Sequence, residues 1–164
     1  ALVIVGLILY LIYLTKPFNS KFKDDHWFRV LIYMATALTL GQIILGTQVR
    51  QFVDEQNKIL GYLNWDFQDL APFKFYVHRS VSILVVILNG LLFYRNRKYL
   101  LGYSKINWVM LLIGLEILTG VAMYYFNFPF SSQPLHLVIA ALLIGVQFYL
   151  VLESRSVKKK SLNA

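Results

Sequence analysis

Apolar stretches long enough to cross a lipid bilayer are the feature that most constrains this chain. A helix needs roughly 20 apolar residues to span ~30 Å of hydrocarbon, and four stretches meet this length. They lie at about residues 28–49, 73–94, 106–126 and 134–152. With 58% hydrophobic and 15% charged residues, the chain is also too apolar for an ordinary soluble domain. The sequence therefore predicts an all-α membrane protein whose centre is a four-helix transmembrane bundle.

A fifth apolar stretch, at residues 1–15, is shorter than a span requires. Because the chain opens on Ala1 rather than Met, we interpret this stretch as the end of one further transmembrane helix that begins earlier. A signal peptide is the alternative, although no basic segment precedes the stretch and no small-residue cleavage pattern follows it. We expect a cytoplasmic linker at 16–27, the bundle at 28–152 and a basic cytoplasmic tail at 153–164.

The distribution of lysine and arginine predicts how the bundle is oriented. These residues gather before the first long stretch, between the second and the third, and after the fourth, which places all three groups on one side of the membrane. The positive-inside rule makes that side cytoplasmic. We therefore predict a multi-pass protein of the bacterial cell (inner or plasma) membrane with a cytoplasmic C-terminus. The run Lys158 to Lys160 suits an anchor to anionic membrane lipid, and the net charge of +8 gives no reason to expect a nucleic-acid partner.

Two histidines suggest a cofactor. His78 and His136 each lie about one turn inside a span, and both spans run from the outer side inwards. Helices of this kind can lie diagonally across a bundle with both imidazoles directed to its centre. A single histidine could be a polar residue of the interface, but ionisable groups inside spans are costly and usually functional. Two facing imidazoles suit the iron of a low-spin haem, whereas zinc normally takes three or four protein ligands. No cysteine is present, which excludes thiolate ligands and disulfides.

Two arginines lie at the same outer level as the histidines. Arg50 and Arg79 are among the few basic residues on that side, and guanidinium groups bind carboxylates with paired hydrogen bonds. We expect both to contact haem propionates. Lipid headgroups or acidic loop residues are the alternative partners.

An internal repeat supports the bundle. The stretch at 28–49 carries Gln42 and Gly46, the stretch at 106–126 carries Glu116 and Gly120, and each of these two stretches is followed by a span that opens with histidine. This pattern predicts two helix pairs related by a pseudo-twofold axis near the cofactor. The two glycines would allow close approach of a helix or a flat ring; helix packing alone is the alternative. For Glu116 we favour a hydrogen-bonded structural role over a part in a proton path.

These residues resemble the C-terminal four-helix half of haem A synthases, and the resemblance covers roughly residues 28–152. Three runs carry it: Gln42-Ile43-Ile44-Leu45-Gly46-Thr47-Gln48-Val49-Arg50, His78-Arg79-Ser80 and Gln133-Pro134-Leu135-His136-Leu137. The family consists of two fused four-helix halves, so the resemblance implies that residues 1–15 end the last helix of a missing N-terminal half. It also implies that His78 and His136 are the axial ligands of haem b. The other half would oxidise the C8 methyl group of haem O to the formyl group of haem A.

The resemblance leads us to expect an oxidoreductase segment that passes electrons and lacks the catalytic half, so no catalytic residue is assigned. The expected partners are membrane lipid, the N-terminal half of the same enzyme, haem O synthase, cytochrome oxidase, a quinol or other electron donor, and a second copy of the chain. A free-standing bis-histidine cytochrome b and a haem-free membrane scaffold are the alternatives. The outer segment 51–77 would contain a short amphipathic stretch that covers the haem edge or lies at the interface.

Overall fold

The computed structural model describes residues 2–15, 22–61, 66–128 and 131–162, with side chains as far as Val157. All of its regular structure is helical within these ranges: α1 (Leu2–Thr15), α2 (His26–Leu60), α3 (Phe67–Leu70), α4 (Phe73–Lys98), α5 (Ile106–Tyr125) and α6 (Ser132–Leu162). The prediction of an all-α protein is confirmed. The first half of the expected linker, residues 16–21, lies outside the described residues, as do the side chains of the proposed lipid anchor at 158–160.

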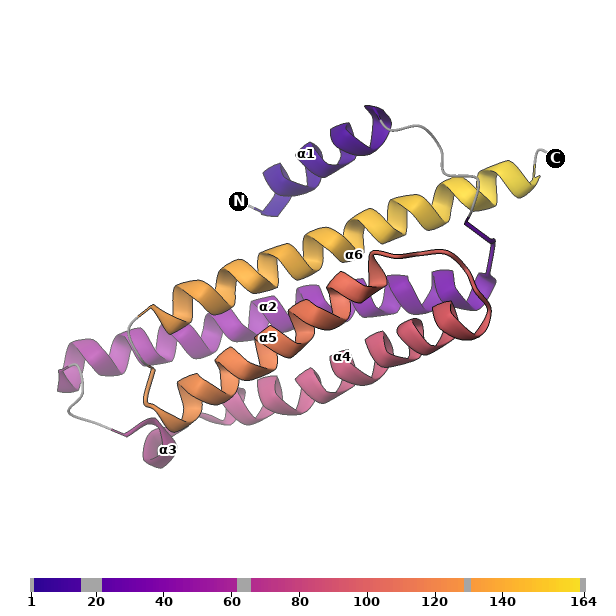
Figure 1. The fold of residues 1–164 in the computed structure, drawn as a ribbon. Helices are drawn as coiled ribbons and strands as arrows, with labels where there is room; N and C mark the ends of the chain where they lie inside the picture. Colours follow the sequence, from indigo (N-terminus) through magenta and orange to yellow (C-terminus); the bar gives the residue numbers. More distant parts are fainter. Residues whose placement is uncertain (1, 16–21, 62–65, 129–130, 163–164) are drawn as a thin grey trace.

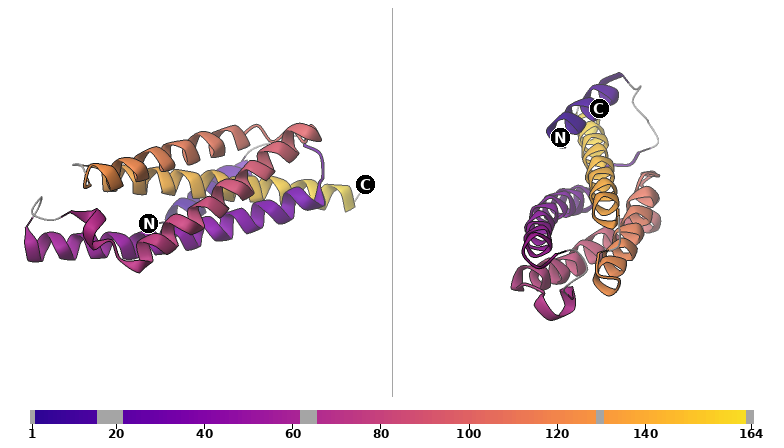
Figure 2. Two further views of the ribbon diagram at one scale, coloured as in Figure 1. Left: turned by 90° about the horizontal axis from the view of Figure 1, so that it is seen from below. Right: turned by 90° about the vertical axis from the view of Figure 1, so that its left-hand side faces the viewer.

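Four of the described helices, α2, α4, α5 and α6, are long and apolar enough to cross a membrane. They run alternately up and down, and α2 packs on α4 and α6 while α5 packs on α4 and α6. Helices α4 and α6 therefore lie diagonally across the bundle and run in the same direction, as expected (Figures 1 and 2). Two helices extend beyond their apolar stretches, because α2 continues to Leu60 and α6 to Leu162. The tail predicted at 153–164 is thus largely a continuation of α6.

The end of the bundle at which α4 connects to α5, here called the inner end, is tightly packed. Phe28, Ile32, Leu92 and Leu150 are fully buried there, and the Tyr103 ring stacks on Phe28 with 4.4 Å between centroids. Charged groups surround this core in pairs. Asp25 accepts two hydrogen bonds from Arg95 at 2.7 and 2.9 Å, and the Lys105 ammonium lies 2.5 Å from Glu153. Because the inner end is filled, the space for a ligand lies towards the opposite end.

The opposite end, here called the outer end, carries a cluster of aromatic side chains around helix α3. Phe67 is fully buried and packs edge-to-face on Phe75 and Phe128, at centroid distances of 5.0 and 4.8 Å. Phe75 stacks on Tyr124 at 5.4 Å. Asn127 holds α3 in place by accepting a hydrogen bond from the Phe67 amide at 3.1 Å. Among the described residues of the outer segment 51–77, helix α3 packs against α5 at this end of the bundle.

Helix α1 lies outside the four-helix bundle and packs along α6 (Figures 1 and 2). Tyr13 meets Tyr149 edge-to-face with centroids 5.9 Å apart. Gly145 allows the close approach, because a Cβ atom at this position would lie 3.2 Å from the Leu9 side chain. An additional helix before the bundle is what the short apolar stretch predicted.

Candidate functional site

A cavity of about 400 Å³ lies between α2, α4, α5 and α6 in the outer half of the bundle. The lining residues nearest the inner end are Thr39, Val85 and Leu143. Those at the outer end are Arg50 and Phe67. The lining is mostly apolar, with a few polar side chains among the aliphatic and aromatic ones. A cavity of this size and character is typical of a site for a small molecule or cofactor.

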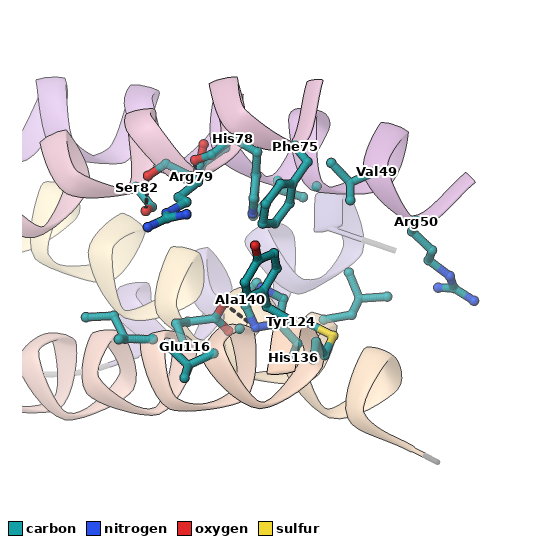
Figure 3. Close-up of a pocket in the computed structure, with 18 of the residues that line it drawn as sticks. Val49, Arg50, Phe75, His78, Arg79, Ser82, Glu116, Tyr124, His136 and Ala140 are labelled. Carbon is teal, nitrogen blue, oxygen red and sulfur yellow. Dashed lines mark hydrogen bonds and ion pairs between the residues drawn. The ribbon is translucent and has the colours of Figure 1, made fainter. Parts of the chain in front are cut away.

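Both predicted histidines line this cavity. His78 enters from α4 and His136 from α6, the two diagonal helices. Figure 3 shows the two side chains reaching into the cavity from opposite walls and pointing towards one another. Because α4 and α6 run in the same direction and each histidine lies about one turn from the start of its helix, the two rings share one depth. The structure thus brings together the pair that the sequence placed at one level.

The His136 ring is held by two side chains of α5. Its Nδ1 atom lies 3.0 Å from Oε2 of Glu116 and 2.8 Å from the hydroxyl oxygen of Thr119. The Glu116 side chain is largely buried, at 17% exposure, and Figure 3 shows it on the same wall of the cavity as His136. Sequence reasoning predicted a hydrogen-bonded role for Glu116 but did not identify its partner. The internal repeat could have indicated this partner, because Glu116 precedes Gly120 by one helical turn and the next span opens with His136.

His78 is held differently. The Gln42 amide donates a hydrogen bond of 2.6 Å to the backbone carbonyl of His78, so Gln42 fixes the helix rather than the ring. The ring Nδ1 of His78 is buried and has no hydrogen-bond partner among the described residues. The ring lies against Gly46, where a Cβ atom would come within 3.2 Å of its Cε1 atom.

The internal repeat is visible in these contacts. Gly46 of α2 faces the His78 ring. Gly120 of α5 faces the His136 ring, and a Cβ atom at position 120 would lie 3.8 Å from its Cε1 atom. The residue one turn before each glycine, Gln42 or Glu116, contacts the same histidine as its glycine. Corresponding positions of the two helix pairs thus have corresponding neighbours, which agrees with the predicted pseudo-twofold arrangement.

The two predicted arginines occupy different places at the cavity. The Arg79 side chain follows the cavity wall beside Ser82, whereas that of Arg50 points away from the histidines (Figure 3). Arg50 is about half exposed and its guanidinium lies 3.6 Å from Asp54, one turn further along α2. An exposed pair at this distance contributes little to stability, so Arg50 is available to other anionic partners.

The model of the COX15-CtaA family, described as cytochrome oxidase assembly protein, matches residues 1–148. Comparison with curated proteins and with solved structures gives no match. The family match includes α1, α2, α4, α5 and the first half of α6, and with them both cavity histidines. The chain is therefore a multi-pass membrane protein that belongs to the COX15-CtaA family of cytochrome oxidase assembly proteins, the haem A synthase family that its motifs resemble.

Proposed function

We propose that the four-helix bundle binds haem b through His78 and His136 and serves haem A synthesis as an electron-transfer domain. The observation that carries this proposal is the pair of imidazoles facing each other across one apolar cavity. Iron in a tetrapyrrole takes two such axial ligands in electron-transfer haems. Family membership supplies the biological context, namely cytochrome oxidase assembly.

The residues of the cavity fit a flat iron porphyrin in three respects. Among the described residues, no hydrogen bond involves the Nε2 atom of either ring, so both atoms are available as ligands. Gly46 lies against the His78 ring, on which a Cβ atom would press at 3.2 Å, and Gly120 faces the His136 ring, where a Cβ atom would lie 3.8 Å away. Aliphatic and aromatic side chains form most of the remaining wall, which suits the apolar faces of the macrocycle.

When bound, the haem iron would accept and release single electrons at the outer end of the bundle. The protein's own residues then have three roles. His78 and His136 would hold the iron, the glycines leave room beside each ring, and the aromatic cluster around Phe67 would limit access of water. Arg79 lines the cavity and is our first candidate for binding a haem propionate. Arg50 is the second candidate, and its side chain would have to turn from Asp54 towards the cavity.

We further propose that the chain acts as the C-terminal half of a haem A synthase. The partner half would bind haem O and oxidise its C8 methyl group, with electrons passing through the haem described above. A quinol or another membrane donor would supply these electrons. The inner end carries the arginine and lysine side chains of the α4–α5 connection, and by the positive-inside rule it would face the cytoplasm of a bacterial cell.

The proposal is tested by the haem content and the spectrum of the purified protein. We expect a pyridine haemochrome of haem b and a low-spin reduced-minus-oxidised spectrum, both lost or strongly changed in His78→Ala and in His136→Ala. His26→Ala is the matched control, because His26 begins α2 at the inner end, away from the cavity. A wild-type protein that purifies without haem, also after reconstitution with it, would favour the alternative of a haem-free scaffold.

A further inference from the structure

We infer that Glu116 is a positioning residue for His136 and that it makes the two axial ligands chemically unequal. This inference rests on the proposed binding of haem between His78 and His136. It concerns a residue of α5 that contacts the His136 ring, and it follows from the difference between the two halves of the repeat.

The contacts of the His136 ring define which of its nitrogens can bind iron. A histidine ligand binds through an unprotonated nitrogen, so its other nitrogen carries the proton. Nδ1 of His136 lies 3.0 Å from the Glu116 carboxyl group and can donate its proton there. The Thr119 hydroxyl can donate its proton to the Leu115 carbonyl oxygen at 2.9 Å. The hydroxyl oxygen of Thr119, 2.8 Å from Nδ1 of His136, is then a second acceptor for the Nδ1 proton. This arrangement keeps Nε2 unprotonated and holds the ring in place.

The other half of the repeat lacks this arrangement. Gln42 occupies the position of Glu116, but its amide donates to the backbone carbonyl of His78 and not to the ring. The His78 Nδ1 atom has no hydrogen-bond partner among the described residues, and Glu116 is the only acidic side chain among the described residues that line the cavity. Within the part of the chain that the structure describes, a carboxyl group is therefore placed against the His136 ring and none against the His78 ring.

This difference has a consequence for the iron. A carboxylate that accepts a hydrogen bond from a metal-bound imidazole makes the ligand more basic and orients it. A more basic axial ligand favours the ferric over the ferrous state, and hydrogen bonds near the cofactor are one of the means by which proteins set its potential. Glu116 should therefore lower the reduction potential of the haem and keep His136 ligated.

The test compares three substitutions at one position. Glu116→Gln keeps the size of the side chain and an acceptor oxygen, so we expect a low-spin haem whose reduction equilibrium moves about tenfold towards the ferrous state, which is about 59 mV for one electron. Glu116→Leu removes the acceptor, so we expect at least about tenfold weaker haem binding and a high-spin fraction. Glu116→Asp keeps the acidic group and should retain more low-spin haem than Glu116→Leu.

Gln42→Leu is the matched control, because it removes the hydrogen bond at the corresponding position of the other half. Because Gln42 contacts the backbone of His78 and not its ring, we expect a smaller shift of the reduction potential in Gln42→Leu than in Glu116→Gln. The inference is overturned if Glu116→Gln leaves the potential unchanged, if Gln42→Leu shifts it equally, or if Glu116→Asp and Glu116→Leu behave alike. A wild-type protein without haem would instead refute the proposed function, so the two failures are distinguishable.

Discussion

The two glycines of the repeat lead to a quantitative prediction, because the structure gives them different amounts of space. A Cβ atom at position 46 would lie 3.2 Å from Cε1 of His78, whereas one at position 120 would lie 3.8 Å from Cε1 of His136. The longer distance is an ordinary van der Waals contact, while the shorter one requires the neighbour to move by a few tenths of an ångström. Gly46→Ala should therefore displace the His78 ring, and Gly120→Ala should leave the His136 ring in place.

The expected free energies follow from two opposing effects. Replacing glycine by alanine inside a helix stabilises it by about 0.8–1 kcal/mol. At position 46 this gain is offset by the displaced imidazole, since a side chain forced about 30° from its rotamer costs about 0.5–1.5 kcal/mol. We expect no net change in the unfolding free energy of Gly46→Ala. For Gly120→Ala we expect a gain of about 1 kcal/mol, or roughly 2–4 °C in the unfolding temperature of a domain of this size.

Gly41→Ala provides the matched control on α2, because no atom lies within 4 Å of the added Cβ. Thermal unfolding in detergent and haem content per protein should be measured for all three variants. We expect wild-type haem content in Gly41→Ala and Gly120→Ala, and reduced content or a high-spin fraction in Gly46→Ala. The reasoning is refuted if Gly46→Ala binds haem as the wild type does and gains as much stability as Gly41→Ala.

Three further predictions concern packing and charge away from the cavity. The hydrogen bonds from Arg95 lower the pKa of Asp25. The stability that they contribute is therefore present above about pH 4 and lost as the pH falls through the lowered pKa. The unfolding temperature should fall less on acidification in Asp25→Ala than in the wild type. Gln147 donates a buried hydrogen bond of 3.0 Å to Asn89, so Gln147→Leu should cost about 1–3 kcal/mol of unfolding free energy. Replacing both residues by leucine should cost less than the sum of the single changes, as a double-mutant cycle would show. Gly145→Ala should leave thermal stability nearly unchanged, because the helix-forming gain of alanine is offset by the shift that its Cβ requires of the Leu9 side chain, 3.2 Å away.

Much of the architecture was predictable from the sequence because it depends on position along each helix. Hydropathy shows which stretches can lie in lipid, and a rise of 1.5 Å per residue converts residue number into depth. The number of spans, their alternating direction and the common depth of His78 and His136 follow from these two quantities. The helix ends were less predictable: α2 and α6 continue into polar sequence, since polar residues can remain helical where the membrane stops.

The tertiary structure decided what depends on rotation about each helix axis. Arg50 and Arg79 lie at similar depth, yet Arg79 follows the cavity wall and Arg50 points away. Gln42 and Glu116 occupy equivalent places in the repeat, yet one reaches a backbone carbonyl and the other a ring nitrogen. Hydropathy and residue spacing do not show which neighbour a side chain points towards, because that direction is set by how the neighbouring helices pack. The sequence alone therefore determined a two-histidine membrane bundle, and only helix packing decided which groups surround each histidine.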